Sequence, residues 1–189
     1  MCILFIALGE HADYPLIVAA NRDEYFARAS EPNFHRFLSG EHHRYNPFNL
    51  IYGDMESVWA WGHRGHHHTR LSRGFHSVSN GPIDQVWPKM SRGVEKLTQY
   101  IRDSQRIDST QLLNIMRDST QAEIEQLPDT GVDTNRERQL SSIFVRGGDY
   151  GTRTTTLLKF SRWCVEIMEC NYSSEGEAVQ TNEFSVTLT

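Results

Sequence analysis

The stretch that decides the fold lies at the beginning of the chain and reads Met1-Cys2-Ile3-Leu4-Phe5-Ile6-Ala7-Leu8, Gly9-Glu10-His11-Ala12-Asp13-Tyr14 and Pro15-Leu16-Ile17-Val18-Ala19-Ala20-Asn21-Arg22-Asp23-Glu24. Its two apolar runs, Ile3–Leu8 and Pro15–Ala20, are separated by a short polar link, which predicts an antiparallel hairpin. The second run ends in three polar residues, Asn21, Arg22 and Asp23. Pairing in a hairpin would bring these side chains back to the start of the first strand, where Cys2 stands.

Cys2 follows the initiator methionine directly. If Met1 is removed, the residue carries a thiol and a free α-amine, whose ordinary pKa of about 7.7–8.0 suits a base at neutral pH. A thiol beside a base and a guanidinium is an activated nucleophile, and a thiolate is also a ligand for a soft partner. The alternative is a small apolar residue in a buried strand, because free cysteine is among the most buried residue types.

Several motifs in chain order carry a resemblance to a known family: Met1-Cys2-Ile3, Leu16-Ile17-Val18-Ala19-Ala20-Asn21-Arg22-Asp23-Glu24-Tyr25, Tyr45-Asn46-Pro47-Phe48-Asn49-Leu50-Ile51, Gly53-Asp54, Ser79-Asn80, Trp87-Pro88-Lys89, Ser142-Ile143-Phe144, Tyr150-Gly151-Thr152-Arg153-Thr154 and Glu183-Phe184-Ser185-Val186-Thr187-Leu188. Together they resemble the NRDE family, also called the Transport and Golgi organisation protein 2 family. The resemblance covers nearly the whole chain, as one domain over residues 1–189.

The resemblance implies an α+β fold, the four-layer αββα sandwich of N-terminal-nucleophile hydrolases. Relatives carry a long insert between the equivalents of Phe34 and Arg36, with two strands that nothing in this sequence matches. Either the chain is a reduced variant of the family or residues are missing from the sequence. Losing two strands from a sheet would leave their neighbours with unpaired backbone groups, and this cost favours missing residues.

Arg22 and Asp23 resemble the arginine and aspartate that flank the nucleophile in bile-salt and penicillin acylases. The resemblance implies that Arg22 favours the thiolate and binds an anionic group of the substrate. It implies that Asp23 holds the α-ammonium group of Cys2. The alternative is a structural ion pair at the end of a strand.

Asn80 and Arg153 complete the candidate site. In the acylases an asparagine in a context like that of Asn80 binds substrate or contributes to the oxyanion site, a task that suits an amide donor. The alternative for Asn80, which precedes Gly81, is an Asx-turn. Arg153 resembles the late arginine of the acylase site, where a second guanidinium would suit a carboxylate or phosphate. Its alternative is a surface arginine on a hairpin.

The histidine cluster of His63, His66, His67 and His68 is a weaker metal candidate. His66 and His68 would share one face of a strand and present two imidazoles to a metal or haem iron. No carboxylate or cysteine lies at a supporting spacing, and the sequence lacks the Cys-x-x-Cys-His motif that attaches haem. We therefore expect no resident metal and interpret His63–Arg73 as a polar return.

The remaining pattern supports the α+β assignment. Strands are expected at Phe48–Tyr52, Val58–Trp61, Phe75–Val78, Ser142–Val145, Thr154–Phe160, Trp163–Cys170 and the final apolar alternation. A helix is expected from Pro88, since Met90, Val94, Leu97 and Ile101 form one apolar stripe, and a second helix from near Asp108. Pro128–Gln139 reads as a polar loop.

Composition narrows the classes of function that the chain can have. The chain has 189 residues and a net charge of −5, with 24 acidic against 19 basic residues, so it lacks the basic excess typical of nucleic-acid binding. No apolar run approaches the roughly 20 residues of a membrane span, and the apolar start has no positive region before it, unlike a signal peptide. Three cysteines without framework spacing indicate reduced thiols. We expect a cytoplasmic protein of undetermined oligomeric state.

Two functions remain open. The resemblance implies a role in intracellular haem movement, linked to acyl-lipid metabolism, with haem or an acyl compound as cargo in a pocket near Cys2 and no required cofactor. The alternative is an N-terminal cysteine amidohydrolase, in which Cys2 attacks the carbon of a C–N amide bond.

Overall fold

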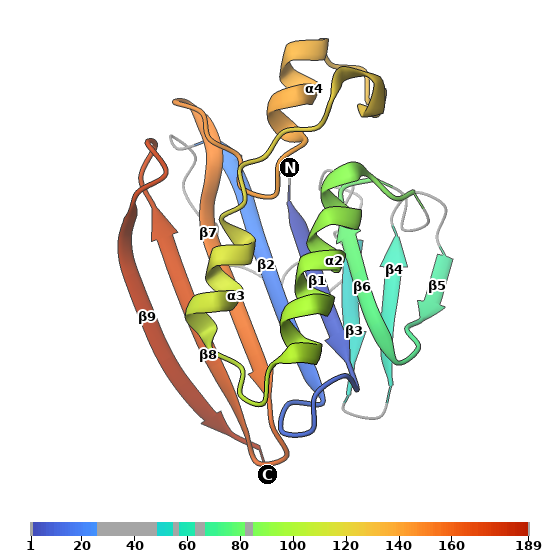
Figure 1. The fold of residues 1–189 in the computed structure, drawn as a ribbon, viewed down its shortest axis with the longest axis vertical. Coiled ribbons are helices and arrows are strands. Elements are labelled where there is room, and N and C mark those ends of the chain that lie inside the picture. The colour runs from blue at the N-terminus through green and yellow to red at the C-terminus, as the bar shows by residue number, and fades with distance from the viewer. Residues whose placement is uncertain (1, 26–48, 55–56, 63–66, 82–84, 189) are drawn as a thin grey trace, which may run out of the picture.

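The fold consists of two antiparallel sheets and a helical layer (Figure 1). The computed structural model describes residues 2–25, 49–54, 57–62, 67–81 and 85–188. The larger sheet has the strand order β6-β1-β2-β7-β8-β9 and the smaller one β3-β4-β5. The strands are β1 Ile3–Leu8, β2 Leu16–Tyr25, β3 Asn49–Gly53, β4 Val58–Gly62, β5 His67–Arg70, β6 Gly74–Ser79, β7 Tyr150–Phe160, β8 Cys164–Tyr172 and β9 Ala178–Thr187.

The predicted hairpin at the start of the chain is confirmed. β1 pairs antiparallel with β2, and Ile3 lies opposite Asn21. On its other side β1 pairs antiparallel with β6, which places Ile3 opposite Ser79. The start of β1 is therefore held between the polar end of β2 and the end of β6.

The helices cover one face of the larger sheet. They are α2 Pro88–Asp103, α3 Ser109–Met116, the short 3-10 helix η3 Ile124–Gln126 and α4 Thr134–Leu140. Figure 1 shows α2 and α3 lying across the strands of the larger sheet. Side chains alternate between the two faces of a strand, so Ile3 and Phe5 point into the core under the helices. Met90 and Leu97 of α2 meet them there, as the predicted apolar stripe required.

The smaller sheet packs against the opposite face of the larger one. Ile6 of β1 lies in a second core cluster with Val58 and Ala60 of β4, joined by Leu4 and Val18. The described residues thus form three layers, helices, sheet and sheet, and the protein is α+β. A fourth, helical layer is not found within the described ranges, so the four-layer sandwich stays a prediction.

Three predictions of local structure differ from the observed elements. Pro128–Gln139 was expected to be a loop, but most of α4 lies in it, started by the Asp133 carboxylate, which accepts a hydrogen bond from the backbone N–H of Arg136 at 3.1 Å. A cap without an apolar stripe gave too weak a helix signal. Ser142–Val145 is not a strand but a buried turn segment. The polar return His63–Arg73 includes strand β5.

The difference at Ser142–Val145 has a clear physical origin. The backbone groups of Ser142–Val145 find partners outside any ladder, since Phe144 N donates to the Asp118 carbonyl oxygen and Val145 N to Thr152 Oγ1. In the sequence, such a buried apolar segment has the pattern of a strand, although its backbone does not pair with a neighbouring strand.

The predicted missing segment between Phe34 and Arg36 lies outside the described residues.

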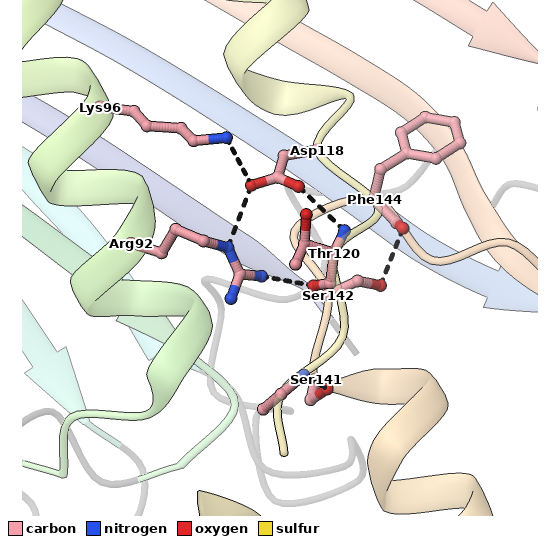
Figure 2. Close-up of polar contacts among 8 residues, drawn as sticks. Arg92, Lys96, Asp118, Thr120, Ser141, Ser142 and Phe144 are labelled. Atoms are coloured by element: carbon pink, nitrogen blue, oxygen red, sulfur yellow. Dashed lines mark hydrogen bonds and ion pairs between the residues drawn. The ribbon is translucent and has the colours of Figure 1, made fainter.

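An ion-pair cluster joins α2 to the segment that follows α3 (Figure 2). The Asp118 carboxylate accepts hydrogen bonds from Lys96 Nζ at 2.8 Å, Arg92 Nε at 3.0 Å and the Thr120 backbone N–H at 2.9 Å. Arg92 also donates to the Thr120 carbonyl oxygen at 2.5 Å. This cluster fixes the outer side of α2, and the apolar stripe of α2 fixes the inner side of the helix against the larger sheet.

Candidate functional site

A cavity of about 460 Å³ opens between the two sheets, beside the start of β1. Its volume lies within the range of roughly 300–1,000 Å³ that small-molecule sites occupy. The walls are mainly apolar, and the larger sheet supplies most of them. The lining residues include Cys2, Leu4, Ala20, Arg22, Asn49, Ile51, Val78, Ser79, Asn80 and Thr156.

Cys2 is fixed at the cavity by its backbone. Its N–H donates to Asn80 Oδ1 at 2.7 Å, and its carbonyl oxygen accepts a hydrogen bond from Ser79 Oγ at 2.8 Å. Both partners come from the end of the neighbouring strand β6. Cys2 is exposed, so the interpretation as a buried apolar residue is wrong. The sulfur belongs to a residue that a ligand in the cavity can reach.

Arg22 lies on the same side of the sheet as the cavity. It is exposed, lines the cavity and stands opposite Thr154 of β7. Because Ile3 pairs with Asn21, the next residue on each strand brings Cys2 and Arg22 to adjacent positions. Cys2 and Arg22 therefore line the same cavity from neighbouring backbone positions.

Asp23 faces the helical layer instead, on the side opposite the cavity. It is 5% exposed, and its Oδ1 accepts a hydrogen bond from Thr152 Oγ1 at 2.6 Å. Burial raises the pKa of Asp23, and the positive charge of the N-terminal amine, the Thr152 hydrogen bond and the charge of Lys89 offset only part of this rise. Asp23 therefore does not line the cavity with Cys2 and Arg22.

Asn80 and Arg153 are separated by the width of three strands. The side chain of Asn80 reaches Cys2, since its Oδ1 accepts a hydrogen bond from the Cys2 backbone N–H. Arg153 lies in β7 at a register shift, since Arg22 pairs with Thr154 and Asp23 with Thr152. Arg153 does not line the cavity, so Cys2, Arg22 and Asn80 are brought together there without it.

Three residues near the site were missed or misread from sequence. Asn21 had no role of its own in the sequence-based prediction, but its buried side chain donates hydrogen bonds to the Met116 and Ile143 carbonyl oxygens at 2.8 and 2.9 Å and so ties β2 to these segments. Asn49 donates to the Ser79 and Gly81 carbonyl oxygens, which pins β3 to β6. Lys89 is 1% exposed.

A signal for Lys89 was present in the sequence. Lys89, Gly93, Leu97 and Ile101 are four residues apart and so share one face of α2, the face that is buried. A lysine on such a row is seldom buried without a partner. The signal that was missed is a charged side chain at a position that the helical pattern places on the buried face of α2.

The histidines do not supply a metal site in the described ranges. His63 and His66 lie outside those ranges. Among the residues that the structure does describe, no group of three or more His, Cys, Asp or Glu side chains is arranged to hold a metal ion.

Comparison with family models gives a match to Transport and Golgi organisation 2, in two stretches that cover residues 1–36 and 29–173. The chain belongs to the Transport and Golgi organisation 2 family. The two matched stretches meet near Phe34 and Arg36, and a missing family segment at that place stays a prediction.

Curated members of the Transport and Golgi organisation 2 family resemble the chain over 134 residues. The mouse (Mus musculus) and human (Homo sapiens) homologues are each 28% identical, over 64% of this chain and 49% of their own length. The bovine (Bos taurus) homologue is 25% identical over the same shares. The chain thus spans about half the length of the curated relatives it matches. No helix in the described part of this chain is long and apolar enough to cross a membrane.

Proposed function

We propose that the chain binds haem, or an acyl compound, as cargo in the cavity beside Cys2. The observation that carries the proposal is a largely apolar cavity with a thiol, a guanidinium and an amide at one end. Apolar walls with a few polar groups are the usual composition of a site for a mostly apolar small molecule. Family membership is consistent with such a role but leaves the ligand open.

The groups at the cavity suit both cargoes. Arg22 would bind a haem propionate or the carboxylate or phosphate of an acyl compound through paired hydrogen bonds. Cys2, as thiolate, would be an axial ligand of haem iron. Ile51 and Val78 would contact the macrocycle or the acyl chain.

Equilibrium titration with haem tests this function. Wild-type protein should change the haem absorption spectrum at micromolar concentration and take up haem from loaded membranes. Arg22→Ala should weaken binding by roughly 10- to 100-fold, the loss expected for hydrogen bonds to a charged group. Arg162→Ala is the matched control, because Arg162 is exposed beside Trp163 on the turn between β7 and β8. A spectrum unchanged by wild-type protein would refute haem binding, and titration with a fatty acyl compound would then test the second cargo.

An N-terminal cysteine amidohydrolase is the second candidate, favoured by the exposed Cys2 and its bond to Asn80. After removal of Met1, Cys2 Sγ would form a bond to the amide carbon while the α-amine takes the thiol proton. The α-amine would pass this proton to the leaving nitrogen as the C–N bond breaks, and water would then hydrolyse the thioester and restore the thiol. The amide nitrogen of Asn80 would donate to the developing oxyanion.

Intact-mass spectrometry separates the two candidates. The hydrolase requires a mass without Met1 and a covalent adduct with an acylating probe that disappears in Cys2→Ala. Retained Met1 on active, folded protein would eliminate this mechanism, whereas haem binding does not depend on it.

Two further features belong to the same proposal. We extend the observed three layers to the four-layer sandwich of N-terminal-nucleophile hydrolases, and we retain the cytoplasmic location predicted from sequence. An experimental structure of a full-length relative and fluorescence microscopy of the tagged protein would test them separately.

A further inference from the structure

Strand β9 is an edge of the larger sheet, with no further strand beside it in the described part of the chain. Figure 1 shows it on the side of the larger sheet that lies away from the smaller sheet. It has 10 residues, and all of them except Asn182 are exposed. An exposed edge strand carries backbone donors and acceptors that can pair with a strand of another chain.

The pairing of β9 with β8 determines which of its backbone groups point outward. The Leu188 N–H donates to the Trp163 carbonyl oxygen at 2.8 Å, so these two residues are a hydrogen-bonded pair of the antiparallel ladder. Such pairs recur at every second residue along the β8–β9 register. The backbone groups of the even-numbered residues from 180 to 188 therefore point to β8, and those of the odd-numbered residues from 181 to 187 point away from the sheet.

The stretch from Gln180 to Thr187 lacks the features that usually keep an edge strand from pairing. Those features are short length, lysine, proline and a bulge. The stretch holds neither lysine nor proline, and its one charged residue is Glu183. The bulge of β9 precedes it, at the register shift that leaves Val179 without a residue opposite. A regular, nearly uncharged edge is therefore available to a second strand.

An apolar row of side chains runs across the sheet to this edge. Val18 of β2, Leu158 of β7, Ile167 of β8 and Phe184 of β9 lie opposite one another in turn. At Val18 the row packs into the core beneath the smaller sheet, whereas at its other end the Phe184 side chain is 53% exposed. A second sheet placed beside β9 would continue the row and cover its open end.

We propose that β9 pairs antiparallel with β9 of a second copy of the chain, around a two-fold axis at Phe184. Glu183 of one copy and Ser185 of the other then form a hydrogen-bonded pair, because the backbone groups of both point outward. The two Phe184 side chains face each other on the axis, which joins the apolar rows of the two copies. Because each copy uses the same edge, the assembly closes at two copies.

The side chains of β9 favour this register over its neighbours. An axis at Glu183 would place two carboxylates directly opposite each other, and like charges in that position are destabilising. An axis at Asn182 would place Phe184 opposite Gln180 and lose the aromatic pair. With the axis at Phe184, Glu183 lies opposite the uncharged Ser185. The strand is thus complementary to its own copy, which identifies a second copy of this chain as the occupant.

Molar mass as a function of protein concentration tests the inference on the full chain without any ligand. Because one strand pair is a small interface, the wild type should change from one copy to two over about 1–200 µM in multi-angle light scattering. Ser185→Pro removes the outward N–H that donates to Glu183 of the other copy, and proline is tolerated where an edge N–H faces solvent. This variant should weaken the dimer by about tenfold or more and keep the circular dichroism spectrum of the wild type.

A second pair of variants tests the same edge without proline and decides the matter if Ser185→Pro does not fold. Phe184→Lys places two positive charges opposite each other on the axis and should also weaken the dimer by about tenfold or more. Val179→Lys is the matched control, because Val179 is 64% exposed but lies at the bulge, outside the paired stretch. It should dimerise like the wild type. A wild type that stays monomeric throughout, or a dimer that Phe184→Lys does not weaken, would overturn the inference.

Cysteine cross-linking locates the axis. In a Cys2→Ser background, which removes the exposed native thiol, Phe184→Cys should form a disulfide between two copies, since the Cα atoms of this pair would lie about 4.5 Å apart. Thr181→Cys should not, because the two Thr181 residues would lie about 20 Å apart along the strands. Equal yields, or more cross-linked dimer from Thr181→Cys, would overturn the inference.

The inference goes beyond the proposed function, because β9 supplies no residue to the cavity. Ligand binding by a chain that stays monomeric would overturn the β9 dimer and leave the proposed function in place. A β9 dimer without ligand binding would do the reverse. A monomer that captures an added peptide strand on β9 would assign the edge to a different protein and overturn the second copy as its occupant.

Discussion

Helix α2 carries two lysines in opposite environments. Lys96 is half-exposed and completes a cluster in which the Asp118 carboxylate is fully supplied with donors. Lys89, two turns earlier, is buried, and this burial lowers the pKa of Lys89 to about 8 although the negative charge of Asp23 opposes the shift. The comparison teaches that a nearby cation is not enough to keep a buried carboxylate charged, because the hydrogen bonds around the carboxylate decide which form is favoured.

The pKa shifts of the two aspartates express this difference. Burial raises the pKa of Asp118, but hydrogen bonds from Lys96 and Thr120 and the charge of Arg92 outweigh it and hold the pKa well below its usual range. At Asp23 burial prevails and the pKa is raised. The surroundings of Asp118 therefore stabilise its charged form, whereas the burial of Asp23 favours its neutral form.

The largest expected effect comes from breaking the element that carries both lysines. Gly93 faces Phe5 of β1, and a Cβ atom there would lie 2.0 Å from Phe5 Cζ. Gly93→Val should lower the free energy of unfolding by about 3 kcal/mol, because overpacking outweighs the gain in helix propensity. Urea unfolding measures the change, and Gly148→Val, at a glycine with open space around it, should stay within about 0.5 kcal/mol. A neutral Gly93→Val would mean that α2 does not press on β1 at this point.

The second largest effect concerns the ion-pair cluster in which Lys96 takes part. Asp118→Asn keeps an acceptor for Thr120 but removes the charge that Arg92 and Lys96 share, and should cost about 2 kcal/mol of unfolding free energy. The exposed Asp149→Asn serves as control in the same urea experiment. Equal stability of the two variants would show that the cluster contributes no more than a surface ion pair.

Acidification should separate the two aspartates. Asp118 stabilises the fold above about pH 4, where an unfolded aspartate is ionised, and this contribution is lost as the pH falls toward its lowered pKa. Asp23 contributes with the opposite sign, because its stabilisation is present below about pH 4 and is lost as the pH rises through its raised pKa.

Urea midpoints measured from about pH 6 to about pH 3 read out both contributions. Compared with the wild type, Asp118→Asn should lose stability less steeply on acidification and Asp23→Asn more steeply. Glu166, whose pKa is also lowered, by hydrogen bonds from Lys159 and Tyr14, is common to all three proteins and cancels in the differences. Parallel profiles would contradict the assigned directions.

The smallest expected effect concerns the Lys89 side. The double variant Lys89→Met, Asp23→Asn should change the unfolding free energy by less than about 1 kcal/mol, because replacing two buried ionisable side chains removes the desolvation cost of both along with their mutual attraction. Urea unfolding measures it, beside each single variant. A loss as large as that of Asp118→Asn would show that the two clusters are equivalent after all.

Much of the fold could be predicted from local pattern. The β1–β2 hairpin and α2 follow from apolar runs and one stripe, since pairing and burial are specified within each segment. The segment Ser142–Val145 could not, because its backbone partners Asp118 and Thr152 are distant in sequence.

The candidate site divides in the same way. Cys2 and Arg22 meet because a hairpin register brings them together, which the sequence specifies. Family resemblance, rather than pattern, singled out Asn80. The burial of Lys89 was not predicted because the groups around it, Asp23, Glu137 and the Leu140 carbonyl oxygen, belong to β2 and α4, and only the tertiary fold places the start of α2 beside them.

The cavity has walls of two origins, and this has an evolutionary consequence. The reactive wall, with Cys2 and Arg22, is fixed by the direct pairing of β1 with β2 and β6, while β3 of the smaller sheet supplies Ile51 opposite. The thiol is therefore fixed by strands on one side of the cavity, whereas the interval between β2 and β6 supplies the opposite wall through β3. Under the proposed function, a change in that interval would alter the contacts that the cargo makes with Ile51 and leave the pairing that holds Cys2 and Arg22 as it is.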